Sequence, residues 1–162
     1  MMNTKKFMGK IISLNKRHID QMAEIDFESE HQLDKASLEE FKERLIKRFK
    51  QGHELFFGYK GNGILKGYVA VKPFFPGYKH CEIYWLAVRK NYQGQGIGTK
   101  LMKFAEAYAR GKGFRKVCLY TNKRMKKTRR FYEKLGYKPV NELPDFYGYP
   151  RNKTAVLYIK KV

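Results

Sequence analysis

Hydrophobic residues recur every three or four positions in four stretches of the chain, and this spacing predicts amphipathic helices. The second stretch has the clearest start, because Ser37 followed by Glu40 matches a capping box. Gly52 and Gly136 are suited to end the second and fourth helices, since glycine readily adopts the left-handed conformation that closes many helices. The predicted helices cover residues 16–27, 38–51, 96–111 and 128–135.

Short apolar runs bounded by turn-forming residues predict seven strands. Gly61, Asn62 and Gly63 tolerate positive φ, so they predict a hairpin between the second and third strands. The fourth run, residues 80–88, is apolar enough to be buried on both faces inside a sheet. Residues 144–150 are expected to form a loop that contains tyrosine and glycine. The predicted strands cover residues 10–15, 54–60, 64–73, 80–88, 116–121, 138–141 and 154–160.

The order of these elements is β, α, α, β, β, β, α, β, α, β, β, which predicts a mixed sheet with helices on its faces. The chain has 162 residues, about the length of one domain, so we expect a single domain over residues 1–162. Hydrophobic residues make up 43% of the chain, which excludes wholesale disorder. No stretch approaches the roughly 20 apolar residues that span a membrane, and the first apolar run is too short for a signal peptide. We therefore expect a cytoplasmic protein without a membrane partner.

Charge is distributed unevenly. Lysine and arginine number 35 against 15 acids, giving a net charge of +20 that favours polyanionic ligands such as nucleic acid, anionic lipid or phosphate-rich molecules. Nine of the acids lie within residues 20–43, where only Lys35 and Lys42 oppose them. This pattern has two interpretations, an acidic binding region on a basic body or simply two solvated helix faces.

A buried strand, a glycine-rich turn and an amphipathic helix follow one another over residues 82–102. Without Cβ atoms at Gly94, Gly96 and Gly98, the amides of the first helical turn can approach a pyrophosphate, which the helix N-terminus also attracts. The spacing differs from the dinucleotide fingerprint, and the acid that this fingerprint requires about twenty residues later is absent. A Walker loop is excluded too, because Gly-Lys-Ser/Thr does not occur here.

Residues 93–98 read Gln-Gly-Gln-Gly-Ile-Gly and resemble the signature of the GNAT superfamily of acetyl-CoA-dependent N-acetyltransferases. The preceding Leu-Ala-Val at residues 86–88 is also typical of that family. About forty residues downstream, Arg-Phe-Tyr-Glu-Lys-Leu-Gly-Tyr at residues 130–137 resembles the family's second motif. The resemblance implies an α/β (α+β) fold with a mixed, mostly antiparallel central sheet of six to seven strands, about four flanking helices and a splay between the fourth and fifth strands.

The resemblance also implies a binding site for acetyl-CoA as co-substrate. The backbone of Leu86, Ala87 and Val88 would pair with the pantetheine. The turn that would hold the diphosphate consists of Gln93, Gly94, Gln95, Gly96, Ile97, Gly98 and Thr99. No metal is expected, since the four histidines and two cysteines lack ligand spacing.

Six cations lie within the eight residues 123–130, near the expected position of the adenosine 3′-phosphate. Lys126 and Arg129 are candidate contacts, although a solvated loop and an RNA contact are equally compatible with this run. Met125 stands where family members commonly carry an asparagine, and Asn122, three residues earlier, is the candidate replacement.

Two side chains are candidates for catalysis by the same resemblance. Glu82 aligns with the base of histone-acetylating members, although a solvated or paired glutamate is the competing interpretation. Tyr132 aligns with the tyrosine that protonates the departing thiolate, and the alternative is a packed aromatic residue. Cys81 and Cys118 lie in apolar strand-like runs, so we expect buried thiols and direct transfer in a ternary complex rather than a covalent intermediate.

The expected partners are acetyl-CoA and a primary amine, either a protein lysine or N-terminus or a small amine. In this family the helices after the first strand form one wall of the acceptor cleft, so the acids of residues 20–43 suggest a cationic acceptor. A homodimer is a possible assembly. The alternative function is a basic nucleic-acid-associated binding module on a GNAT-like fold, with residues 123–130 as its footprint.

Overall fold

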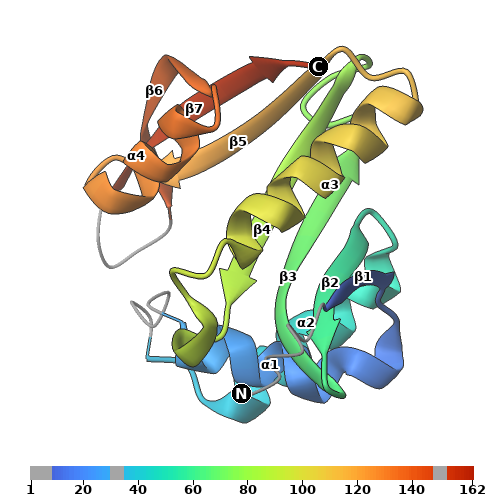
Figure 1. Cartoon of the computed structure of the whole chain (residues 1–162). Coiled ribbons are helices and arrows are strands. Elements are labelled where there is room, and N and C mark those ends of the chain that lie inside the picture. The colour runs from blue at the N-terminus through green and yellow to red at the C-terminus, as the bar shows by residue number, and fades with distance from the viewer. Residues whose placement is uncertain (1–8, 30–34, 148–152) are drawn as a thin grey trace, which may run out of the picture. The chain divides into compact units, whose positions relative to one another are not determined.

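A computed structural model describes residues 9–29, 35–147 and 153–162 (Figure 1). The order of helices and strands agrees with the predicted order, apart from two short 3-10 turns. The elements are β1 (Lys10–Ser13), η1 (Lys16–His18), α1 (Ile19–Glu28), α2 (Leu38–Gln51), β2 (Leu55–Gly61), β3 (Ile64–Pro73), β4 (His80–Val88), η3 (Lys90–Tyr92), α3 (Ile97–Gly111), β5 (Lys116–Asn122), α4 (Lys126–Lys134), β6 (Lys138–Tyr147) and β7 (Lys153–Lys161).

The fold is mixed α/β, with a seven-stranded, mostly antiparallel sheet in the order β1-β2-β3-β4-β5-β7-β6. Its contacts divide the chain into two compact units. The N-terminal unit comprises Met1–Val71 and Trp85–Phe104, and the C-terminal unit comprises Lys72–Tyr84 and Ala105–Val162. Strands β3 and β4 and helix α3 each run from one unit into the other. That the whole chain acts as one domain stays a prediction.

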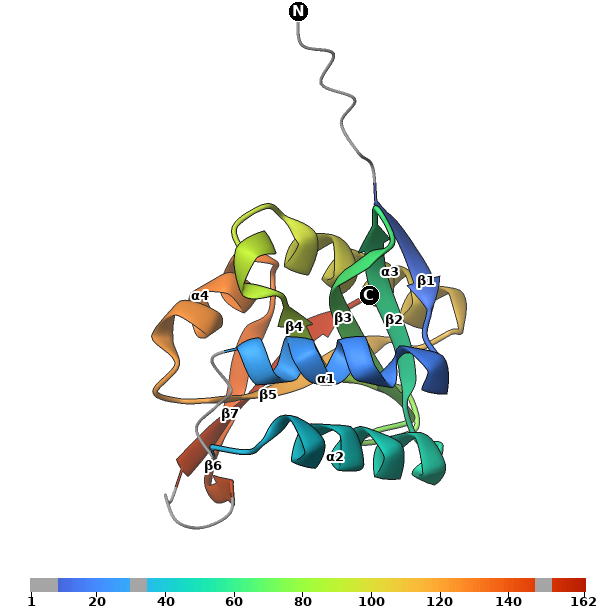
Figure 2. The ribbon, with the colours of Figure 1, turned by 90° about the horizontal axis from the view of Figure 1, so that it is seen from below.

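In the N-terminal unit, β1, β2 and β3 pair antiparallel, and α1 and α2 lie side by side (Figure 2). The predicted capping box begins α2: Ser37 Oγ accepts the Glu40 backbone N–H at 3.2 Å, and the Glu40 carboxylate accepts the Ser37 N–H at 2.6 Å. Gly52 ends the helix at φ +70°, as its position predicted. The helices bury their apolar sides in a core formed with β2 and β3, whose fully buried members include Met22, Ile25, Leu45, Leu65 and Tyr68.

In the C-terminal unit, β5 pairs antiparallel with β7, which pairs antiparallel with β6 (Figure 1). The parallel pairing of β4 with β5 consists of three residue pairs, from His80–Lys116 to Glu82–Cys118. This short pairing agrees with the expected splay between the fourth and fifth strands. Within the described parts of the chain, no helix has the length and apolar character needed to cross a membrane.

Two sequence-based expectations about strands were wrong. Strand β4 is not buried on both faces: Cys81 and Ile83 are buried, but Tyr84 between Ile83 and Trp85 is 43% exposed. Residues 144–147 belong to β6 rather than to a loop, while residues 148–150 of the expected loop lie outside the described residues. Strand β6 contains Pro139 and Pro144, which is tolerated because it lies at the edge of the sheet and its register shifts near both prolines.

Candidate active site

The predicted site residues fall into two groups, one in each unit. In the N-terminal unit, the end of β4 leads through η3 into an exposed turn before α3. Gly94 and Gly96 adopt φ values of +75° and +80°, and a Cβ built on either would meet no atom within 4 Å. The helix begins at Ile97, which is buried, while Gln93 to Gly96 are exposed. The chain therefore presents open backbone at the N-terminus of a 15-residue helix, a geometry suited to phosphate.

Side chains fix the two ends of this turn. The Gln93 side-chain amide donates to the Val88 carbonyl at 3.0 Å, and the Gln95 amide donates to the Asn91 carbonyl at 3.3 Å. Upstream, the Arg89 backbone N–H donates to the Lys66 carbonyl at 2.8 Å, so β3 and β4 stay paired up to the turn. The glutamine of the signature thus holds the turn against the end of β4.

Arg89 anchors the start of the turn through its side chain. Its guanidinium donates to the Leu65 carbonyl at 2.7 Å and forms ion pairs with Glu24 at 2.8 Å and Glu28 at 3.1 Å. The arginine side chain is only 12% exposed, so these contacts are screened less than those of a surface pair. The sequence pattern did not single out Arg89.

The ion pairs of Arg89 with Glu24 and Glu28 change the interpretation of the acids within residues 20–43. Asp20 and Glu39 pair with Lys42 at 3.4 and 3.3 Å, besides the two glutamates that pair with Arg89. Asp26 is 2% exposed, so it is neither solvated nor available to attract a ligand. Glu30 and Asp34 lie outside the described residues. Most of the described acids thus have internal partners, and the cationic acceptor stays a prediction.

Asp26 is the centre of a buried polar cluster that sequence reasoning missed. Its carboxylate accepts hydrogen bonds from the Tyr68 hydroxyl at 2.7 Å and from the Trp85 indole N–H at 2.8 Å. Burial raises the pKa of Asp26 from near 3.8 to about 6, although both hydrogen bonds oppose the shift. Its position three and four residues after Ala23 and Met22, on the apolar face of α1, was a signal that it could be buried.

In the C-terminal unit, Tyr132 lies on α4 and is 8% exposed. Burial and the neighbouring Tyr147 raise the pKa of the Tyr132 phenol, so it keeps its proton at neutral pH. Its ring packs edge-on against Tyr137, with centroids 6.0 Å apart. Both interpretations of this residue, a proton donor and a packed aromatic ring, are compatible with this environment.

Glu82 is half-buried and forms the last residue pair between β4 and β5, opposite Cys118. It therefore lies inside β4 rather than at its end, at the point where the paired segment of the two strands stops. Burial raises the pKa of Tyr120 on β5, and the charge of Glu82 raises it further. Its role as a base stays a prediction.

The extended β6 brings further aromatic rings into this region. Phe146 stacks on Tyr120 with centroids 4.9 Å apart and an interplanar angle of 19°. Phe146 also packs edge-on against Tyr147 at 5.1 Å. Burial raises the pKa of Tyr147 to about 12. Because residues 144–147 were expected to form a loop, no sequence signal pointed to these rings.

Some residues of the basic run 123–130, which extends into α4, form hydrogen bonds within the protein. The Arg129 guanidinium donates to the Tyr158 hydroxyl at 2.9 Å and to the Lys123 carbonyl at 3.3 Å. Asn122 is buried, and its side-chain oxygen accepts the Arg124 N–H at 3.0 Å, which shapes the turn before α4. Lys126 is exposed. The three candidate phosphate contacts are Asn122, Lys126 and Arg129, and of these only Lys126 is exposed to solvent.

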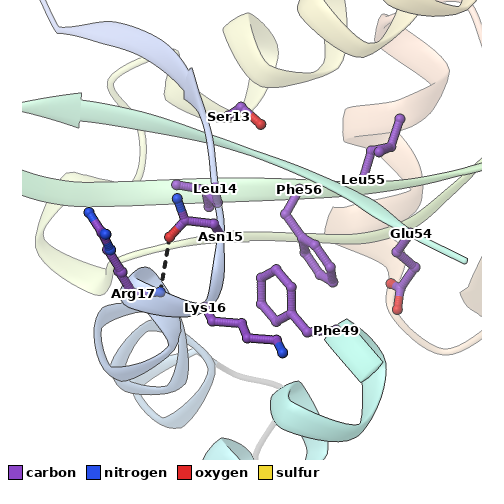
Figure 3. Close-up of a pocket in the computed structure, with 9 residues that line it drawn as sticks. All are labelled: Ser13, Leu14, Asn15, Lys16, Arg17, Phe49, Glu54, Leu55 and Phe56. Atoms are coloured by element: carbon purple, nitrogen blue, oxygen red, sulfur yellow. Dashed lines mark hydrogen bonds between the residues drawn. The ribbon is translucent and has the colours of Figure 1, made fainter. Parts of the chain in front are cut away.

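A cavity of about 510 Å³ lies elsewhere in the N-terminal unit (Figure 3). The Phe49 and Phe56 rings stack there with centroids 4.4 Å apart. None of the predicted site residues lines it. Its lining consists of Ser13, Leu14, Asn15, Lys16, Arg17, Phe49, Glu54, Leu55 and Phe56.

Both cysteines are buried, as the sequence predicted, and neither forms a disulfide. Burial raises the pKa of Cys81 to about 12 and that of Cys118 to about 11. Thiols with such pKa values are poor nucleophiles at neutral pH, because the thiolate is scarce.

A family model described as the acetyltransferase (GNAT) family matches residues 19–137, a span that contains the turn, Glu82 and Tyr132. The chain belongs to the GNAT family of acetyltransferases. Among curated proteins, "Probable N-acetyltransferase 14" of Xenopus tropicalis is 36% identical over 72 residues, which make up 44% of this chain. The matched region spans about a third of that relative, 34% of its length.

Solved structures of acetyltransferases share the fold. The ribosomal-protein-S18-alanine N-acetyltransferase of Escherichia coli matches with a TM-score of 0.78 at 17% identity, over 95% of this chain and 94% of that chain. The PaiA N-acetyltransferase of Thermoplasma acidophilum, solved in complex with coenzyme A, matches with a TM-score of 0.74 at 22% identity, over 95% of this chain and 99% of that chain. At these identities the likeness concerns the fold.

Proposed function

We propose that this protein is an N-acetyltransferase that transfers the acetyl group of acetyl-CoA directly to a primary amine. The observation that carries the proposal is the exposed turn with two left-handed glycines at the start of α3, in a chain of the GNAT family. A Cβ built at Gly94 or Gly96 would have no atom within 4 Å, and this open space beside the backbone supports a diphosphate site at the turn. The coenzyme A complex of a structural neighbour supports the same ligand class.

The proposal gives each predicted residue a role in binding. The backbone at Leu86, Ala87 and Val88 pairs with the pantetheine, and the turn from Gln93 to Thr99 binds the diphosphate. Lys126 supplies a cation for a further phosphate, whereas Asn122 and Arg129 chiefly shape the loop before α4 and act there indirectly.

The reaction requires a neutral amine, because a protonated amine has no lone pair. An ordinary lysine at pH 7 is mostly protonated, and removing the proton costs about 4.6 kcal/mol. In the proposed reaction, Glu82 accepts a proton from the amine directly or through water. The amine nitrogen then bonds to the thioester carbonyl carbon, the carbon–sulfur bond breaks, and Tyr132 donates its proton to the departing thiolate. The second proton that the nitrogen loses as the amide forms returns to the Tyr132 phenolate, and Glu82 releases its proton to solvent. Tyr132 is protonated at neutral pH, which this step requires.

The acceptor belongs to the amine class, and a panel assay identifies it. We would incubate the protein with acetyl-CoA and separate protein, peptide, polyamine and aminoglycoside acceptors, and measure free coenzyme A. Transfer to at least one amine, confirmed by the acetyl mass shift on that acceptor, is the expected result. Specific binding of acetyl-CoA without transfer to any acceptor would instead identify a coenzyme A sensor.

A pH profile tests Glu82 separately. Glu82→Gln should lower kcat at neutral pH and recover part of it as the pH rises, because more acceptor amine then loses its proton unaided. A profile parallel to that of the wild type would remove Glu82 from the base role while leaving the cofactor site intact.

A further inference from the structure

The hairpin that joins β3 to β4 exposes an unusual number of aromatic rings for its length. Phe74 is 60% exposed and Tyr78 is 76% exposed. Phe75 is 40% exposed, and Tyr84, on the strand that follows, is 43% exposed. Aromatic side chains ordinarily bury most of their area, so a group of exposed rings marks an interaction site. We call this group, with Lys72 and Lys79, the hairpin surface.

The hairpin surface is held in place by its own contacts within the C-terminal unit. The Phe74 N–H donates to the His80 carbonyl at 2.9 Å, and the His80 N–H donates to the Gly77 carbonyl at 3.0 Å. The Phe74 ring packs edge-on against Phe114 at 5.0 Å and lies nearly parallel to Tyr78, with an interplanar angle of 26°. A ligand would therefore meet rings that are already positioned, which lowers the entropy cost of binding.

Cations lie directly beside these rings. Lys72 Nζ is 3.6 Å from the centroid of the Tyr84 ring and 5.5 Å from that of Phe75. Lys79 Nζ is 4.9 Å from the Tyr78 centroid. The surface thus offers flat apolar faces and positive charge within a few ångströms of each other.

The segments that surround the hairpin add further cations. The backbone N–H groups of Arg115 and Lys116 both donate to the Lys79 carbonyl, at 3.0 and 3.3 Å, and Lys161 on β7 pairs with Lys116 on β5. The three segments that meet there, residues 72–81, 107–117 and 154–162, contain no aspartate or glutamate. The acids that flank these segments are Glu82 and Glu106, and Glu106 pairs with Lys160 at 2.9 Å, so the region around the hairpin surface has an excess of positive charge.

We propose that the hairpin surface binds single-stranded nucleic acid. Exposed rings stack with unpaired bases of any sequence, and neighbouring lysines and arginines neutralise the phosphates. A duplex keeps its bases stacked inside, so rings at a loop tip would gain little from it. This location differs from residues 123–130, which the charge run alone had suggested, because those eight residues include six cations but no aromatic residue.

Fluorescence anisotropy with a labelled oligouridylate tests the proposal at several salt concentrations. Tyr78→Ser should weaken binding about 5- to 150-fold and leave the salt dependence unchanged, because a stacked ring is lost and no charge. Lys79→Gln should weaken binding and reduce the slope of log affinity against log salt by about 0.7. Since Tyr78 is 76% exposed, its replacement should not disturb folding, and thermal melting checks this.

The matched controls place the same changes elsewhere. Lys47→Gln removes one exposed charge on α2 and should alter binding only slightly. Lys127→Gln with Arg130→Gln tests the run on α4. The proposal is overturned if the wild type does not bind the oligonucleotide, if duplex RNA binds as well, or if the α4 variant rather than Tyr78→Ser abolishes binding. It is also overturned if Tyr78→Ser affects only binding to anionic phospholipid vesicles or only self-association in light scattering.

Discussion

The glycine turn before α3, the proposed cofactor site, and the surroundings of Tyr132 are built in different ways. The turn presents backbone: two glycines at positive φ, a helix N-terminus and side chains that hold its ends. In the C-terminal unit the candidate groups are side chains: the buried phenols of Tyr132 and Tyr147, whose pKa values are raised by desolvation, and the Glu82 carboxylate, which lies where β4 and β5 stop pairing. A backbone site tolerates sequence change outside its glycines, whereas a side-chain site depends on each residue and on its neighbours.

A substitution within the turn should give the largest effect and tests its backbone character. Gly96→Asp places a Cβ and a negative charge at φ +80°, so the KM for acetyl-CoA should rise about 100-fold or more. Gly63→Asp is the matched control, because Gly63 has φ +74° and equally open space in the β2–β3 turn. Steady-state kinetics with equal KM values for the two variants would remove the turn from the cofactor site.

Removing a single hydroxyl tests the side-chain region. Tyr132→Phe should lower kcat about 10- to 1,000-fold, because the departing thiolate loses a positioned proton donor, while the KM for acetyl-CoA changes little. Single-turnover measurements of coenzyme A release separate this chemical step from product release. A wild-type kcat in the folded variant would mean that Tyr132 only packs against Tyr137 and Phe131.

The buried carboxylate of Asp26 shows what side chains contribute in the N-terminal unit. Its pKa is raised in the folded state, so the native protein binds this proton more tightly than the unfolded chain does. The stabilising contribution is present below about pH 3.8 and is lost as the pH rises through about 6, a loss of about 3 kcal/mol.

Asparagine does not titrate, so Asp26→Asn does not have this pH-dependent loss. The difference in free energy of unfolding, variant minus wild type, should therefore increase by about 3 kcal/mol between about pH 3.5 and pH 7.5. Urea unfolding of both proteins across this range measures the difference, in which the other titrating groups cancel. A constant difference would show that Asp26 does not titrate with a raised pKa.

The smallest expected effect concerns the anchor of the turn. Arg89→Met keeps the β3–β4 backbone pairing but removes the contacts with Glu24, Glu28 and the Leu65 carbonyl, so the KM for acetyl-CoA should rise about 3- to 10-fold with kcat unchanged. Arg89→Lys should restore part of the affinity by keeping one charge. If Arg89→Met instead lowers only kcat, Arg89 has no part in positioning the turn.

The same contrast explains what could be predicted from the sequence. The capping box at Ser37, the left-handed Gly52 and the turn at Asn62 and Gly63 were predicted correctly, because each depends on the conformation of a few adjacent residues. The motif at residues 93–98 belongs to this class too, since glycines at defined positions specify a backbone path.

Features that depend on distant residues were missed. Asp26 was counted among the nine acids of residues 20–43, as part of either a binding region or a solvated face, although Tyr68 and Trp85, far along the chain, enclose it. Arg89 had no signal, because its partners come from α1 and β3. Phe146 was expected in a loop, and its place in β6 depends on pairing with β7, which no local pattern around Pro144 indicates.

The two buried thiols have a practical consequence for measuring the reaction. A disulfide reagent that becomes coloured on reacting with free coenzyme A would leave Cys81 and Cys118 untouched, because both are fully buried and hold their protons at assay pH. The enzyme's own background in such an assay should be close to zero while it stays folded. Two reactive thiols per chain would appear only on unfolding, so the same reagent, in the absence of acetyl-CoA, counts unfolded molecules.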